Sequence, residues 1–232
     1  MHKFKIIIPS LFSMLALLFA YYAVLASVNH EFINACYGII AAMIFDSLDG
    51  RSARLLNCCT QFGASLDSLV DMMAYGVAPS LMMFNWNLHH LGKFGYLVCF
   101  IMCACAGLRL ARFNIMLDIQ DKRFFKGLSS TMAGGFVVSF LLACNQFNWY
   151  GEIIIIASAI ITLASALLMV SNFKFYSFKY LPGNPKVSGT ILIIIILGLL
   201  SLIPIYKGLV IFGFLGTYIT INLLLQPIYN KI

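Results

Sequence analysis

Charged residues are scarce in this chain. Only 10% of its 232 residues are Asp, Glu, Lys or Arg, whereas 62% are hydrophobic. A soluble domain carries charge on about a quarter of its residues, because its surface faces water. So low a content excludes an ordinary water-covered surface, and lipid must cover the protein instead. The length suits one bundle of membrane helices without a separate soluble domain.

Other absences exclude further classes of protein. None of the seven cysteines falls in a CxxC pair, so zinc and thioredoxin chemistry have no support, and we interpret the cysteines as small buried side chains. The net charge is +7, but no basic stripe with interleaved aromatic residues accompanies it, which argues against a nucleic-acid partner. The first apolar run continues past the length of a signal-peptide core, so we expect it to be retained as a helix.

The hydrophobic residues are grouped in long runs. Eight segments approach the roughly 20 residues that an α-helix needs to cross a bilayer. They cover approximately 6–28, 32–49, 65–84, 94–115, 131–147, 152–171, 188–205 and 208–228. The sequence therefore predicts an all-α, polytopic membrane helix bundle with about eight transmembrane helices.

The basic residues are divided unevenly between the two ends of these segments. With the N-terminus in the cytoplasm, 13 of the 15 Lys and Arg residues fall on the cytoplasmic side, and only Lys93 and Lys207 fall on the other. Cytoplasmic loops of membrane proteins carry such an excess of Lys and Arg. We therefore expect a protein integral to the cytoplasmic (inner) membrane, with both termini in the cytoplasm.

Acidic residues are rarer still, yet half of them lie close together. The chain has eight Asp and Glu residues, and four of these are Asp46, Asp49, Asp67 and Asp71. The first two are three residues apart and the last two are four apart, so each pair shares one face of its helix. Because the first pair closes one segment and the second opens the next, we expect four carboxylates to meet at the cytoplasmic level.

Such a cluster needs a positive partner. Each ionised Asp in a membrane helix costs roughly 2.5–3.5 kcal/mol, so four cost about 10 kcal/mol before their mutual repulsion. A divalent cation removes this cost, and carboxylate ligands suit Mg²⁺, Mn²⁺ or Ca²⁺ better than zinc. Gly50 and Gly63 permit the close approach of a ligand, and Arg54 offers a donor fork to a phosphate oxygen. The sequence therefore predicts a site for metal and phosphate.

The spacing of these residues matches a long motif. Residues 46–71 read D-x2-D-G-x2-A-R-x8-G-x3-D-x3-D, with fixed positions at Asp46, Asp49, Gly50, Ala53, Arg54, Gly63, Asp67 and Asp71. In this the chain resembles the CDP-alcohol phosphatidyltransferase family. The resemblance implies a six-helix catalytic core, which we place at 1–171, followed by a loop and two additional transmembrane helices in 172–232.

The resemblance also implies roles for the motif residues. Two divalent ions, Mg²⁺ or Mn²⁺, are expected on the four aspartates. Asp71 is expected to act as the general base, with Asp67 beside it in catalysis. The nucleotide and pyrophosphate of a CDP-linked lipid are expected beside Gly50, Ala53, Arg54 and Gly63. A homodimer formed through membrane helices is implied as well.

Further stretches narrow the resemblance. Three stretches are similar to those of the CDP-diacylglycerol–serine O-phosphatidyltransferases: 62–71 continued by 75–79, 108–114 followed by 125–128, and 168–171 with Lys174 and Lys179 after it. This similarity implies transfer of a phosphatidyl group from CDP-diacylglycerol to the hydroxyl of L-serine, with CMP released at the cytoplasmic side.

The acceptor is expected to bind near the fourth predicted segment. Arg109 and Arg112 share a helix face, and a guanidinium group can hold the carboxylate of serine through two hydrogen bonds. Asn114 can hydrogen-bond the amine or hydroxyl, and Lys126 adds positive charge. Basic residues after a span are also what membrane orientation requires, so this cluster has two interpretations.

Three alternatives remain open. The same reaction could use glycerol 3-phosphate, inositol phosphate or choline as the acceptor. The aspartates could instead line the ion path of a cation transporter, or the chain could be an inactive lipid-binding scaffold. The enzyme interpretation is favoured because the acids lie at one end of their segments, rather than at mid-span, and no internal symmetry accompanies them.

Overall fold

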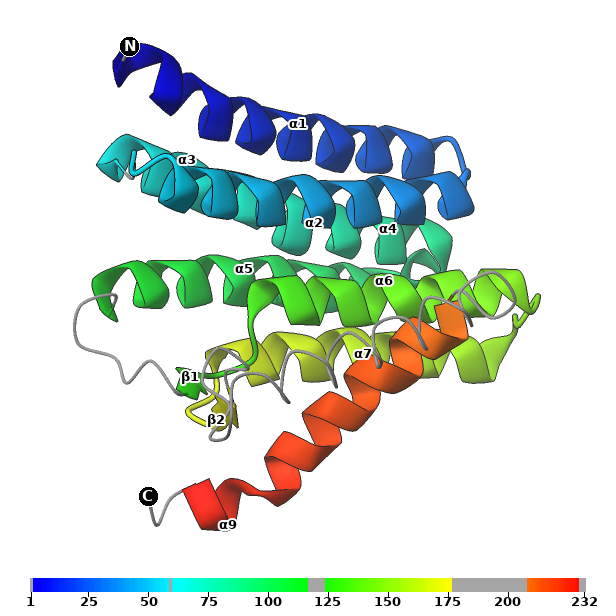
Figure 1. The fold of residues 1–232 in the computed structure, drawn as a ribbon. Helices are drawn as coiled ribbons and strands as arrows, with labels where there is room; N and C mark the ends of the chain where they lie inside the picture. The colour runs from blue at the N-terminus through cyan, green and yellow to red at the C-terminus, as the bar shows by residue number, and fades with distance from the viewer. Residues whose placement is uncertain (1, 59, 117–123, 177–207, 230–232) are drawn as a thin grey trace.

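Long helices account for most of the fold (Figure 1). The computed structural model describes residues 2–58, 60–116, 124–176 and 208–229. Its elements are α1 (His2–Val28), α2 (Phe32–Leu55), α3 (Gln61–Asp71), the π-helix η1 (Met72–Val77), α4 (Ala78–Trp86), the 3-10 helix η2 (Leu88–Leu91), α5 (Lys93–Met116), β1 (Phe124–Lys126), α6 (Ser130–Gln146), α7 (Glu152–Val170), β2 (Lys174–Tyr176) and α9 (Gln226–Tyr229). A further helix, Gly208–Leu224, precedes α9.

Four of these helices are long and apolar enough to cross a membrane. They are Ile7–Val28, Phe32–Leu55, Lys93–Ile115 and Glu152–Val170. Large apolar side chains point outward from them, with Ile153 81% exposed and Leu108 61% exposed. Such a surface requires lipid around it, so the chain is a polytopic helical membrane protein.

The number of membrane crossings stays a prediction. Helices occupy seven of the eight predicted segments. In the third segment, three consecutive helices, α3, η1 and α4, follow one another. The remaining segment, 188–205, lies outside the described residues. Some boundaries differ from the expectation, since α2 continues past position 49 to Leu55 and α3 begins at Gln61, before position 65. Gly50, Ala53 and Arg54 therefore stand on the last turns of a helix rather than in a loop.

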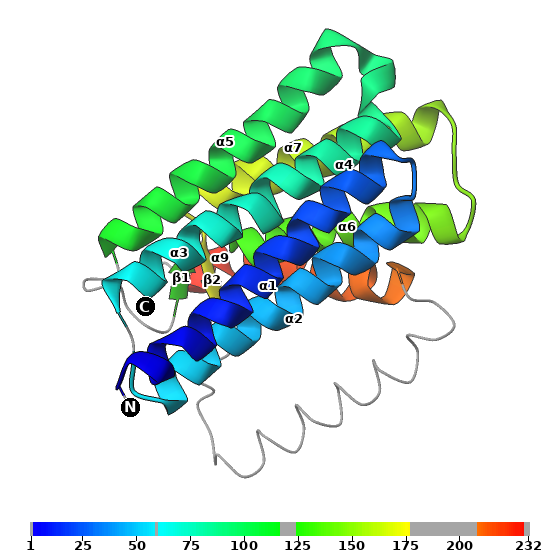
Figure 2. The same ribbon diagram turned by 90° about the horizontal axis from the view of Figure 1, so that it is seen from above.

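The helices pack in an antiparallel arrangement that brings several ends together. α1 runs beside α2, and the rod formed by α3, η1 and α4 lies between α1 and α5 (Figures 1 and 2). α7 packs on α5, and α6 packs on both α2 and α7. The end of α2, the start of α3 and the end of α5 all lie at the end of the bundle that carries β1 and β2 (Figure 1).

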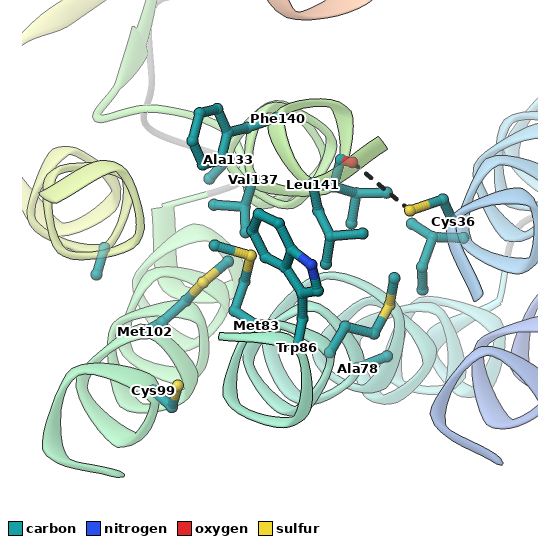
Figure 3. Packing of buried hydrophobic residues seen from close by; sticks show 14 of the residues in the cluster. Cys36, Ala78, Met83, Trp86, Cys99, Met102, Ala133, Val137, Phe140 and Leu141 are labelled. Carbon is teal, nitrogen blue, oxygen red and sulfur yellow. Dashed lines mark hydrogen bonds between the residues drawn. The ribbon is translucent and has the colours of Figure 1, made fainter. Parts of the chain in front are cut away.

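Apolar side chains from several helices fill the centre of the bundle (Figure 3). The rings of Trp86 and Phe140 meet edge to face with their centroids 6.2 Å apart. Cys36 and Cys99 are buried in this core, as predicted, and the Cys36 thiol donates to the Val138 carbonyl oxygen at 3.7 Å. The packed core gives the helix ends a rigid support.

The sequence did not predict a small sheet at the same end. β1 and β2 pair antiparallel, with Lys126 opposite Lys174. The side-chain amide of Gln226 continues this ladder, because it accepts from the Lys174 amide at 2.9 Å and donates to the Lys174 carbonyl oxygen at 2.7 Å. The ring of Phe212 stacks on Phe136 of α6 at 4.7 Å. The C-terminal helix is therefore attached to the earlier part of the chain.

Candidate active site

The turn between α2 and α3 brings the two aspartate pairs to one level. After α2 ends at Leu55, Asn57 takes a left-handed backbone conformation with φ 50°. Thr60 then starts α3, since its hydroxyl oxygen accepts a hydrogen bond from the Gly63 amide at 3.0 Å. This N-cap satisfies one of the free amides at the start of the helix. The chain reverses within a few residues, so the pairs face each other.

The structure brings the four carboxylates together. Asp46, Asp49 and Asp67 each offer one oxygen, and these three oxygens lie within 4.8 Å of one another. The carboxyl groups of Asp46 and Asp71 are within hydrogen-bonding range of each other. Asp49 is buried, and the other three are partly buried. Acidic groups so close together repel one another unless a cation lies between them.

The donor set fits a divalent cation that prefers oxygen. Carboxylate oxygens from two helices are the ligands that Mg²⁺ and Mn²⁺ favour, and the cluster offers no thiolate or imidazole. The three oxygens of Asp46, Asp49 and Asp67 are close enough for one ion to contact them all. The cluster can therefore hold a divalent metal ion.

Two hydroxyl groups outside the motif contact this cluster. The Ser13 hydroxyl in α1 donates to Asp49 Oδ2 at 2.7 Å, and the Tyr75 hydroxyl in η1 donates to Asp46 Oδ2 at 3.0 Å. Sequence reasoning assigned neither residue a role. A signal existed for Tyr75, which follows Asp71 by four residues and so continues its helix face. Ser13 is 36 residues from Asp49, and no local pattern joins them.

Gly50, Ala53 and Arg54 of the motif lie on the last turns of α2. Arg54 is exposed, and its Nε donates to the Gly50 carbonyl oxygen at 2.8 Å, so the side chain folds back along the helix. A Cβ atom at Gly50 would lie 3.9 Å from Arg54 Nη2, which is an ordinary contact. Ala53 is partly buried. The guanidinium group of Arg54 is thus exposed beside Gly50, the residue that follows Asp49.

Arg109 is the arginine of α5 that lies within electrostatic range of Asp71. Its guanidinium group interacts electrostatically with Asp71, donates to Ser130 Oγ at 2.7 Å and lies 5.6 Å from the centre of the Phe113 ring. A close helix contact sets this position, because a Cβ atom at Gly76 would lie only 2.9 Å from Cβ of Ala106. η1 and α5 therefore approach closely one turn before Arg109.

Arg112 has different partners. Its guanidinium group donates to four main-chain carbonyl oxygens, those of Lys126 at 2.8 Å, Val170 at 2.9 Å, Met169 at 3.0 Å and Ser171 at 3.3 Å. Three of these carbonyls belong to the end of α7, where unpaired carbonyls carry the negative end of the helix dipole. Arg112 thus joins α5, α7 and β1.

The two remaining residues expected at the acceptor site lie apart from each other. Asn114 is exposed, and its amide donates to Ser68 Oγ at 3.0 Å, next to Asp67 in sequence. Lys126 is exposed on β1, with its carbonyl oxygen bound by Arg112. The structure therefore brings Arg109 to the carboxylates, Asn114 to the neighbouring turn of α3, and Lys126 to the sheet.

This arrangement offers a carboxylate cluster for a divalent cation with a guanidinium group beside it. Such a site suits a substrate with a phosphate group and a second group of negative charge. The site lies at one end of a membrane bundle, where a lipid headgroup can meet a water-soluble molecule.

Comparison with known proteins gives several close relatives. The CDP-diacylglycerol–serine O-phosphatidyltransferase of Helicobacter pylori (strain ATCC 700392 / 26695) is 33% identical over 227 residues, which cover 96% of this chain and 94% of the relative. The archaetidylserine synthase of Methanothermobacter thermautotrophicus is 31% identical over 172 residues, covering 73% and 70%. The CDP-diacylglycerol–serine O-phosphatidyltransferase of Bacillus subtilis is 33% identical over 150 residues, covering 65% and 78%.

A family description matches a large part of the sequence as well. The model of the CDP-alcohol phosphatidyltransferase family matches residues 6–170, which include both aspartate pairs and Arg109. The match spans well over half of the chain and ends with α7. The relatives that align with most of the chain and the family match point to the same kind of protein. The chain therefore belongs to the CDP-alcohol phosphatidyltransferase family.

Proposed function

We propose that this chain transfers the phosphatidyl group of CDP-diacylglycerol to the hydroxyl of L-serine, which gives phosphatidylserine and CMP. The observation that carries the proposal is the meeting of Asp46, Asp49 and Asp67 within 4.8 Å, with Asp71 and Arg109 beside them. Relatives named for serine transfer, at 33% identity over nearly the whole chain, support the choice of acceptor.

The reaction exchanges one P–O bond for another. The hydroxyl oxygen of serine forms a bond to the phosphatidyl phosphorus, while the bond from that phosphorus to the CMP oxygen breaks. The electron pair of the broken bond leaves with CMP. The proton of the serine hydroxyl passes to the carboxylate of Asp71, which is the aspartate that interacts with Arg109.

The aspartates also hold the metal ions in this proposal. We assign Asp46, Asp49, Asp67 and Asp71 as ligands of two divalent ions, Mg²⁺ or Mn²⁺, because all of them offer oxygen. When bound, such ions supply positive charge for the pyrophosphate and for the leaving CMP. Asp67 is counted with Asp71 among the catalytic residues. The nucleotide and pyrophosphate lie beside Gly50, Ala53, Arg54 and Gly63.

Arg109 is our choice for the carboxylate of the acceptor. It lies beside Asp71, so serine held there places its hydroxyl near the proposed base. Arg112 has its donors directed at carbonyl oxygens of α7 and β1, which favours a role in supporting the acceptor site rather than in contacting serine. Asn114 and Lys126 complete the acceptor region in this proposal, at its edge.

Orientation and organisation follow from the same assignment. We place the active site on the cytoplasmic face of the cytoplasmic membrane, because the end of the bundle with Arg51, Arg54, Arg109 and Arg112 is the positively charged one. Residues 1–171 form the catalytic core, a division supported by the family match at 6–170. Residues 172–232 are the C-terminal addition. A homodimer is proposed from the family resemblance, and light scattering of the detergent-purified protein tests it.

The acceptor is tested by the release of CMP. The purified protein receives CDP-diacylglycerol and Mn²⁺, together with L-serine, glycerol 3-phosphate, inositol phosphate or choline in separate reactions. We expect release with serine alone, its loss on addition of EDTA, and a phosphatidylserine product detected by mass spectrometry. Release with another alcohol and not with serine would keep the chemistry and overturn the acceptor. A folded preparation that releases no CMP with any alcohol would overturn the enzyme.

A further inference from the structure

Two hydroxyl groups outside the aspartate motif are bonded to its first pair. We propose that Ser13 and Tyr75 are positioning residues that orient the carboxylates of Asp49 and Asp46 for binding a divalent ion. The inference rests on the proposed function only in taking these aspartates as metal ligands. It adds residues of α1 and η1 to a centre otherwise built from α2 and α3.

Each hydrogen bond restricts a carboxylate that would otherwise rotate. A carboxylate group turns readily about its Cβ–Cγ bond, and a hydroxyl bonded to Oδ2 sets the direction of the other oxygen. Ligands of metal ions commonly receive such a bond from a neighbouring group, and its loss typically lowers metal affinity or activity by 10–100-fold. In this structure Asp46 and Asp49 have such donors from two different elements.

Tyr75 has little freedom to place its hydroxyl elsewhere. The residue is fully buried, and its ring is rigid beyond Cβ. Its main chain is pressed against α6, because a Cβ atom at Gly134 would lie 3.1 Å from Tyr75 Cα. Tyr75 also stands in the π-helix η1, which begins directly after Asp71, and such turns are frequent at functional sites. The hydroxyl therefore reaches Asp46 from a fixed point.

Ser13 makes the equivalent contact from α1. Its hydroxyl lies 2.7 Å from Asp49 Oδ2 and 3.3 Å from the Pro9 carbonyl oxygen. A hydroxyl has one proton, and the shorter bond to a charged acceptor is the stronger. Both Ser13 and Asp49 are about 95% buried, at 4% and 5% exposure, so water does not compete easily. The proton therefore goes to Asp49, and α1 becomes part of the metal centre.

Direct metal binding tests this proposal without any alcohol. Mn²⁺ is titrated into the detergent-purified protein, and free Mn²⁺ is measured by electron paramagnetic resonance. Tyr75→Phe keeps the ring and removes the hydroxyl, and Ser13→Ala removes the other donor. We expect each change to raise the apparent Kd for Mn²⁺ about tenfold. Ser139→Ala is the matched control, since Ser139 is buried but bonds only the Phe136 carbonyl of its own helix, and its Kd is expected to stay within twofold.

A second measurement separates positioning from general support. CMP release is recorded over a range of Mn²⁺ concentrations, with the alcohol that works best. We expect both variants to need more Mn²⁺ for half of their maximal rate, while the KM for the alcohol at saturating Mn²⁺ stays within twofold. Variants with a lower thermal midpoint but unchanged Mn²⁺ affinity would overturn the proposal. The titration contains no acceptor, so an error in the serine assignment leaves its result intact.

Discussion

The aspartate cluster and the arginine pair of α5, Arg109 and Arg112, lie at the same end of the bundle. The aspartates share one site, whereas the two arginines have different partners. The four aspartates come together, and three of their oxygens lie within 4.8 Å. Arg109 and Arg112 are three residues apart, yet Arg109 is the one that interacts electrostatically with Asp71. The guanidinium group of Arg112 instead donates hydrogen bonds to four main-chain carbonyl oxygens. Two charges on one helix face thus have separate tasks.

The difference has a physical origin. Four like charges in a membrane protein are unfavourable unless they share a cation. A cluster of aspartates is therefore expected to direct its carboxylates toward one cation site. An arginine has several donors and suits any group of acceptors, whether a substrate or the carbonyls at a helix end. Helical spacing therefore predicts which aspartates meet, but it does not tell which arginine is free for a ligand.

The largest effect is expected at Asp71. Replacing Asp71 with Asn keeps the size of the side chain and removes the group that we propose as the acceptor of the serine proton. General bases contribute about 10²–10⁴-fold to a rate, so CMP release should fall at least about a hundredfold. The rate is measured at saturating serine and Mn²⁺. Activity near that of the unchanged protein would mean that another group takes the proton.

The next effect separates the two arginines. Arg109→Gln removes the proposed partner of the serine carboxylate, and a charge-assisted pair is about twice as strong as a neutral one. We expect KM for serine to rise about tenfold, which corresponds to about 1.4 kcal/mol. The thermal midpoint should fall less than for an Arg112 variant, because Arg109 donates one side-chain hydrogen bond, to Ser130 Oγ, whereas Arg112 donates four. Serine concentration series for both proteins check this, and an unchanged KM would remove Arg109 from the acceptor site.

Arg112→Gln should give the reverse pattern. The change removes donors to the end of α7 and to β1, and hydrogen bonds to a charged group contribute about 1.5–3 kcal/mol. We expect a loss of about 2 kcal/mol in stability, seen as a lower thermal midpoint in detergent. KM for serine should stay within threefold. A large rise in KM at full thermal stability would instead place Arg112 in contact with the acceptor.

The smallest effect concerns the attachment of the C-terminal helix. Gln226→Leu removes both hydrogen bonds to the main chain of Lys174 while the apolar volume is kept. A neutral hydrogen bond contributes about 1 kcal/mol net, so the stability loss should be modest. Hydrogen exchange at β2 should rise, because its outer edge is uncovered. Exchange equal to that of the unchanged protein would show that other contacts hold this strand.

The local spacing of the aspartates was enough to predict which carboxylates form the site. Asp46 and Asp49 share a face at three residues, Asp67 and Asp71 at four, and a short reversal between them was enough to expect a cluster. Tyr75 continues the second spacing and could have been included. Ser13 could not, because its contact with Asp49 depends on how α1 packs against α2. The small sheet was missed for a similar reason, since β1 and β2 have three residues each and pair across a long stretch of sequence.

The sequence by itself determined that this protein is embedded in lipid and that it gathers acidic side chains for a divalent cation. Both conclusions follow from composition and short-range spacing, because hydrophobic length and helical periodicity act within one segment. Only the tertiary structure decided that Ser13 and Tyr75 bond the first aspartate pair and that Arg109 and Arg112 diverge. Those contacts join distant segments, so they exist only once the helices have packed.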